Sequence, residues 1–175
     1  KNWTSDKQDL WARLTVLGSG RQVGRSAFLL QTPNSNVLLD CGVDVASSGK
    51  DKFPVFTVPE FDIGKLDAVI ISHAHLDHVG LLPYLFKMGY KGPVYMTAPT
   101  RDISSLLQLD FIGVAYKQAE APLYSSKDIK EVVKHSITLN YNEVTDIAPD
   151  LRITFYNAGH VLGSAQIHIN IGNGA

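Results

Sequence analysis

The sequence predicts an α/β fold with mixed sheets. Three observations support this. Short apolar runs separated by turn residues occupy the first forty positions, a continuous apolar run at 68–72 is followed by a segment with helical spacing, and strand-like runs return in the last forty residues. The 175 residues suffice for one sizeable core without disulfide or metal staples. We therefore expect any metal to serve function rather than folding.

The first part of the chain predicts three successive antiparallel strands. Apolar-rich runs at 11–17 and 26–31 flank a glycine-bearing loop, and a third run at 36–39 follows the turn Thr32-Pro33-Asn34-Ser35. The stretch from Asp44 to Phe61 has no sustained period and mixes polar residues with aromatic anchors. It is expected to be an ordered surface loop.

The middle of the chain predicts alternating strands and helices. The run 68–72 is typical of a buried strand, and apolar residues at helical spacing between 79 and 88 precede Gly89. A strand is expected at 93–96. Apolar residues three and four apart predict a long helix over 100–117, and Ser125 or Ser126 can cap a shorter one over 126–135. The remaining expected strands are 136–139, 143–147, 151–156 and 165–171.

Composition and charge exclude several classes of protein. A net charge of -1, without blocks of like charge, disfavours a strongly basic nucleic-acid module. The single cysteine, Cys41, excludes an internal disulfide framework and cysteine-rich zinc fingers. No apolar run reaches the 18 residues that a membrane span needs, and the polar start has no signal-peptide character. We expect no membrane association and a cytoplasmic location.

The segment His73-Ala74-His75-Leu76-Asp77-His78 forms an H-x-H-x-D-H motif between the buried strand and the following helix. From composition, three histidines and one aspartate in fixed places arise by chance on the order of 5 × 10⁻⁴ times per chain. His73 and His75 leave an extended segment on the same side, while Asp77 and His78 come from the helix entrance. Imidazole and carboxylate ligands suit Zn²⁺ and hence metal-assisted hydrolysis.

Two distant residues are candidates for the same site. His160 lies between Gly159 and the glycine at 163, which permit a tight turn that could bring the imidazole to the metal. Asp40 ends the apolar run 37–39, where a carboxylate could hold the outer N–H of a ligand histidine. A plain strand-ending turn is an equal alternative for Asp40, and Asp77 taken alone could be a helix cap.

Other residues that invite functional interpretations favour structural ones. His135 closes an expected helix, and His168 lies on the polar face of an expected strand. Cys41 has no neighbouring His or Lys in sequence and is expected to be a small buried hydrophobe. The glycines of 18–24 have the spacing G-x-G-x-x-x-G and precede no helix, which argues against a dinucleotide site.

With these motifs assembled, the chain resembles the metallo-β-lactamase superfamily. Asp40 matches the first motif of that superfamily, the segment 73–78 the second and His160 the third. Within it, Leu38-Leu39-Asp40-Cys41-Gly42-Val43 and Gly159-His160-Val161-Leu162-Gly163-Ser164-Ala165 are similar to β-CASP nucleases, especially the archaeal homologues of the nuclease subunit of the cleavage and polyadenylation specificity factor. The resemblance implies an αβ/βα sandwich with mixed sheets, incomplete in this chain.

The resemblance also implies an activity. Such proteins are zinc-dependent ribonucleases, endonucleases and in some members also 5′ exonucleases, that hydrolyse RNA phosphodiesters in mRNA 3′-end processing and transcription termination. By position, His73, His75 and His160 would hold one of two Zn²⁺ ions. Asp77 and His78 would bind the second ion and be catalytic. Asp40 would support a ligand histidine by accepting from its outer N–H. Single-stranded RNA is the implied partner, in a homodimer or as a subunit of a processing complex.

The chain departs from this family in extent. Residues 1–175 correspond to the N-terminal part of a metallo-β-lactamase domain, and no residue matches the metal-bridging Asp, the β-CASP domain or the KH modules. This piece alone is therefore expected to be inactive and to hold zinc incompletely. Two alternatives stay open, a hydrolase of a small ester, thioester or lactam, and an inert scaffold of a processing complex.

Overall fold

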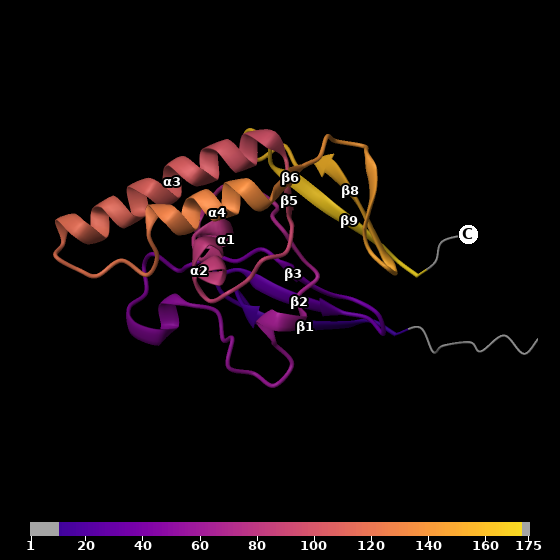
Figure 1. The fold of residues 1–175 in the computed structure, drawn as a ribbon, viewed down its shortest axis with the longest axis horizontal. Helices are drawn as coiled ribbons and strands as arrows, with labels where there is room; N and C mark the ends of the chain where they lie inside the picture. Colours follow the sequence, from indigo (N-terminus) through magenta and orange to yellow (C-terminus); the bar gives the residue numbers. More distant parts are fainter. Residues whose placement is uncertain (1–10, 173–175) are drawn as a thin grey trace, which may run out of the picture.

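A computed structural model describes residues 11–172, which form three layers (Figure 1). Helices cover one face of a six-stranded sheet, and a second, three-stranded sheet lies against the other face. The arrangement confirms the α/β fold with mixed sheets that the sequence predicts. No helix within 11–172 combines the length and the apolar character that crossing a membrane requires.

The larger sheet is mixed because its two halves are connected differently. The first three strands are antiparallel neighbours joined by short loops, whereas the last three run parallel to the third and are reached through longer crossovers. In spatial order the strands are β1 (Arg13–Gly18), β2 (Ala27–Gln31), β3 (Asn36–Leu39), β4 (Ala68–Ile70), β5 (Val94–Met96) and β6 (Ser136–Thr138).

The smaller sheet consists of three antiparallel strands, β7 (Val144–Ala148), β8 (Leu151–Asn157) and β9 (Ala165–Ile171). The β7–β8 connection is short, and the longer β8–β9 loop contains His160. Figure 1 shows this sheet beside the last strands of the larger one, on the side away from the helices.

The helices of the outer layer are α1 (Leu76–Val79), α2 (Leu82–Lys87), α3 (Ala98–Lys117) and α4 (Ser126–His135), with short 3₁₀ turns at Gly49–Lys52 and Ile63–Lys65. The Thr97 hydroxyl caps α3 by accepting from the amide of Thr100. At α4, Ser125 is the N-cap residue, one of the two expected from the sequence, and it forms a reciprocal capping box with Asp128.

Alternating side chains of the buried strands supply two separate cores. In β4, Val69 packs with the helices, while Ala68 and Ile70 face the smaller sheet. The side toward the smaller sheet includes Ile153 and Phe155, both fully buried. A strand buried on both faces must be apolar throughout, which explains the continuous run in the sequence.

The structure differs from the sequence prediction in two helical segments. The helix expected at 79–88 is split at Gly80–Leu81, because the Leu81 amide donates to the Cys41 carbonyl and the Asp77 carbonyl accepts from Ser26 instead. In α3 the helix is correct, but the face turned inward includes the polar Ser104 and Gln108, whereas Leu106 is 67% exposed. Packing against α1, rather than hydrophobic spacing, orients this helix: Gln108 Nε2 donates to the Val79 carbonyl.

Candidate metal centre

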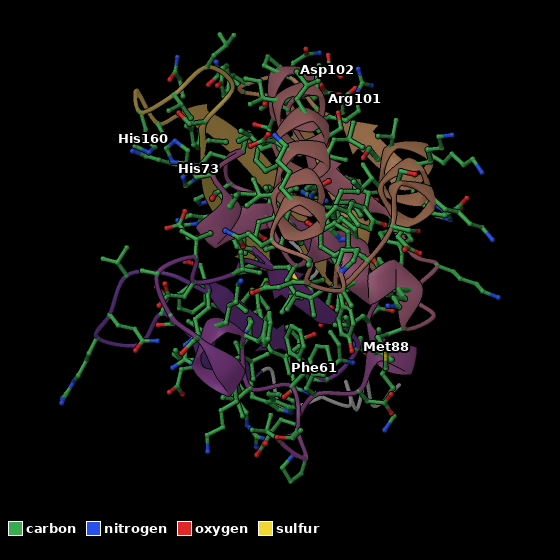
Figure 2. All side chains as sticks on the ribbon, turned by 90° about the vertical axis from the view of Figure 1, so that its left-hand side faces the viewer. Phe61, His73, Met88, Arg101, Asp102 and His160 are labelled. Carbon is green, nitrogen blue, oxygen red and sulfur yellow. The ribbon has the colours of Figure 1, made fainter. Side chains whose placement is uncertain are left out.

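The site lies at the edge of the larger sheet where β3 and β4 end. Because these strands are parallel, Asp40 after β3 and the segment Ser72–His75 after β4 emerge at the same edge. The β8–β9 loop brings His160 to it from the other sheet. Figure 2 shows His73 and His160 next to each other at this edge.

Three of the histidines converge. His73, His75 and His160 each offer a ring nitrogen, and these atoms all lie within 4.8 Å of one another. His160 Nε2 is 3.3 Å from His75 Nδ1. The centroids of the His73 and His75 rings are 4.9 Å apart, and each is 5.0 Å from that of His160. Residues 85 positions apart in the chain therefore face one small space.

Asp40 organises two of the site histidines. Its Oδ2 accepts from His78 Nδ1 at 2.7 Å and from the Ser72 hydroxyl at 2.8 Å, while Oδ1 accepts from the Ser72 amide at 2.8 Å. Since the single hydroxyl proton of Ser72 is donated to Asp40, His73 Nδ1–H must donate to the Ser72 oxygen, 2.9 Å away. In the neutral form of each ring, these contacts place the proton on Nδ1 and leave Nε2 available as a ligand.

Asp77 and His78 lie beside the three-histidine cluster. His78 Nε2 is 3.5 Å from Asp77 Oδ2, and the His78 ring centroid is 4.0 Å from that of His73. Within residues 11–172, the group whose donor atoms all lie within 4.8 Å of one another comprises the other three histidines and not this pair. The geometry therefore groups His73, His75 and His160 as one candidate ligand set, with Asp77 and His78 beside it.

The pKa values of the neighbouring histidines His73 and His78 are shifted in opposite directions. Burial, together with the charges that His78 and the other imidazoles would carry, lowers the pKa of His73 to about 4. Burial also acts to lower the pKa of His78, but the hydrogen bond and charge of Asp40 outweigh it and raise that pKa above its ordinary value. His73, 9% exposed, is accordingly neutral and ready to bind a cation near pH 7.

Backbone hydrogen bonds fix the two segments that contribute these residues. The amide of Cys41 donates to the His78 carbonyl and that of Val43 to the Leu76 carbonyl. Gly42 is required between them, because a Cβ there would lie 1.7 Å from the Asp77 carbonyl oxygen. Asp40 has a φ of 57°, a left-handed conformation that aspartate tolerates better than most residues.

Three hydroxyls that sequence reasoning did not single out support the His160 loop. Thr97 and Thr100 both donate to the Gly163 carbonyl, at 2.7 and 3.0 Å. The Ser164 hydroxyl accepts from the amides of His160 and Val161. Ser72 was missed in the same way. Threonine and serine are common everywhere in sequences, so only their contacts identify them.

The other candidates lie outside the cluster. His135 Nδ1 is 2.9 Å from the Glu131 carbonyl oxygen and its ring packs near Phe86, while His168 lies near Tyr156. Cys41 is fully buried, and burial together with the charge of Asp40 raises its thiol pKa well above the usual value. These findings agree with the structural interpretations of the three residues.

The donor set fits a transition-metal ion. Three converging imidazoles match the number of protein ligands in catalytic zinc sites, and the Ser72 and Asp40 contacts give His73 the outer support that such ligands need. His73, His75 and His160 would hold one ion. From the described part of the chain, Asp77 and His78 offer two ligand groups for another.

The fold and the site together define an α/β sandwich domain with a histidine-rich metal-binding edge. The family model described as the metallo-beta-lactamase superfamily domain matches residues 29–173, and the chain belongs to this superfamily. It is 61% identical, over 165 residues, to a protein of Methanothermobacter thermautotrophicus named transcription termination factor FttA; the match covers 94% of this chain and 26% of that protein. A protein of the same name from Thermococcus kodakarensis is 55% identical over 97% of this chain and 27% of its own length.

These similarities confirm the resemblance to the archaeal branch that the sequence indicates. The chain spans about a quarter of the length of the curated relatives it matches. Among solved structures, a B3 metallo-β-lactamase with an active-site glutamic acid superposes with a TM-score of 0.58 at 18% identity, covering 91% of this chain and 55% of that one. At this identity the likeness extends to the fold alone.

Proposed function

We propose that this chain is the metal-binding, N-terminal part of the metallo-β-lactamase domain of a zinc-dependent ribonuclease that hydrolyses single-stranded RNA in transcription termination and 3′-end formation. The observation that carries the proposal is the convergence of His73, His75 and His160, with the His73 ring oriented by Ser72, in a chain similar to archaeal termination factors. An inert scaffold would require neither this convergence of histidines nor the hydrogen bonds that orient His73 and His78.

The residues have distinct roles in this proposal. A zinc ion held by the three histidines would supply Lewis-acid chemistry for hydrolysis. Asp40 keeps His78 oriented directly and His73 through Ser72. Asp77 and His78, whose Oδ2 and Nε2 atoms lie 3.5 Å apart beside the cluster, would contribute to a second ion that acts on the phosphodiester.

The test is cleavage of single-stranded RNA by the complete protein that the gene encodes, loaded with zinc. Asp77→Ala and His78→Ala are each expected to lower kcat/KM by at least about 100-fold. His168→Ala, which changes a histidine remote from the cluster, is the matched control and is expected to retain wild-type activity.

Wild-type cleavage by both site variants would refute the assigned roles. Turnover of a chromogenic lactam or thioester, without cleavage of RNA, would support the small-molecule hydrolase instead. Zinc binding with no hydrolysis of any of these substrates would support the scaffold.

A further inference from the structure

An apolar groove adjoins the metal centre. It has a volume of about 500 Å³ and lies between the β1–β2 loop, the loop that follows Val43, and α3. Val23 and Val45 form two walls, and Leu76 and Leu107 contribute further apolar surface. His75 and Asp77 line one end, so the groove and the candidate metal centre are continuous.

The walls of the groove are exposed but held in place. Val23 is 85% and Val45 60% exposed, although both are large apolar side chains. The two loops meet where Gly24 approaches Asp44 so closely that a Cβ would lie 2.7 Å from the carboxyl carbon. Arg25 Nη1 also donates to the Phe53 carbonyl, which attaches the β1–β2 loop to the loop below it.

The side chains that line the groove offer few free donors or acceptors that could distinguish one ligand from another by hydrogen bonds. Of the two carboxylates in the lining, Asp44 already accepts from the amides of Ala46 and Ser47 at Oδ1 and from the Ser47 hydroxyl at Oδ2. A ligand group here is therefore recognised by its flat or apolar surface. The remaining polar groups, His75 and Asp77, belong to the site where a phosphate would lie.

We propose that this groove binds a nucleobase next to the scissile phosphate, without preference for its identity. The proposal rests on the proposed function and specifies the substrate contact. A phosphodiester at the histidine cluster places its attached nucleoside within reach of the continuous groove, and a base can stack on aliphatic surface through its face, which all bases share. The volume is in the range of pockets that hold small organic ligands.

The direct test uses the 175-residue chain with its valine and leucine methyl groups observed by NMR. Adenosine 5′-monophosphate and uridine 5′-monophosphate are expected to shift the methyl signals of Val23, Val45 and Leu107 and to bind within about threefold of each other. Ribose 5-phosphate is expected to leave those signals unchanged. The methyl readout reports on the groove with or without zinc and requires no catalysis.

Variants separate the groove from the metal centre. Replacing both Val23 and Val45 by serine is expected to weaken nucleotide binding about fivefold. Val144→Ser alters a valine of comparable exposure, 62%, on the smaller sheet and is the matched control. Methyl signals that do not respond to either nucleotide would overturn the proposal, as would equal shifts with ribose 5-phosphate.

The complete gene product distinguishes this proposal from the proposed function. If it cleaves RNA, a substrate with an abasic nucleotide beside the scissile bond is expected to show a kcat/KM about fivefold lower than the intact substrate. If removing the base at any position near the scissile bond leaves kcat/KM unchanged, the base site is overturned while the proposed function stands. If it cleaves no RNA, the proposed function fails, while the nucleotide titration still decides the groove. Val23 and Val45 methyls shielded by another protein segment and insensitive to nucleotide would overturn the base site.

Discussion

Replacing Asp40 by asparagine should weaken zinc binding, although Asp40 acts by orienting histidines and is not itself assigned as a zinc ligand. The carboxylate accepts three hydrogen bonds of 2.7–2.8 Å, and one oxygen serves both His78 and Ser72. Asparagine has the same shape and tolerates the left-handed backbone at φ 57°, but its amide nitrogen cannot accept. The change therefore removes orientation without imposing backbone strain.

The size of the effect follows from how many histidines lose support. Loss of one outer partner of a ligand histidine lowers metal affinity about 10- to 100-fold. Ser72→Ala removes the support of His73 alone and is expected near the low end of that range. Asp40→Asn disturbs both His73 and His78 and is expected near the high end. The double variant should bind zinc about as weakly as Asp40→Asn, because the serine acts through the same carboxylate.

Competition with a chromogenic zinc chelator measures these affinities, and urea unfolding shows whether each variant is folded. Asp146→Asn, in an exposed pair with Arg152, is the matched control. A folded Asp40→Asn variant that binds zinc as tightly as the wild type would refute the orienting role. Additive losses in the double variant would show that Ser72 acts independently of Asp40.

Three further outcomes follow from the structure. Gly42→Ala should destabilise the chain by more than about 3 kcal/mol in urea unfolding because of its collision with the Asp77 carbonyl, whereas Gly113→Ala, in open space on α3, should stabilise it by about 0.5–1 kcal/mol; similar values for the two would contradict the packing argument. The Cys41 thiol, whose pKa is raised by burial, should react with Ellman's reagent at pH 8 only after unfolding, and rapid reaction of the folded chain would disprove its burial. The pKa of His73 is about 4 in the folded chain and 6.5 ordinarily, so the unfolded chain takes up this proton first as the pH falls. The unfolding free energy of the metal-free chain should therefore decrease between pH 6.5 and pH 4. If His73→Asn shows the same dependence of unfolding free energy on pH, His73 is not its source.

Secondary structure was largely predictable because the local patterns and the tertiary contacts agree. The apolar run at 68–72 includes β4, and Ser125, one of the two serines expected to cap α4, is its N-cap residue. The prediction was wrong where backbone groups found partners outside their own segment. The helix expected at 79–88 is interrupted because Cys41, distant in sequence, binds the Leu81 amide.

The site shows the same division. The sequence by itself determined the motif of His73, His75, Asp77 and His78, because unusual residue types at fixed spacing are visible without a fold. It also nominated His160 and Asp40 for the same site, and the structure brings His160 Nε2 to 3.3 Å from His75 Nδ1. Only the tertiary structure decided that Ser72 links His73 to Asp40 and that Val23 and Val45 line a groove beside them. Such contacts join segments whose separation in the chain carries no signal, and parallel strands ending at one edge of a sheet bring them together.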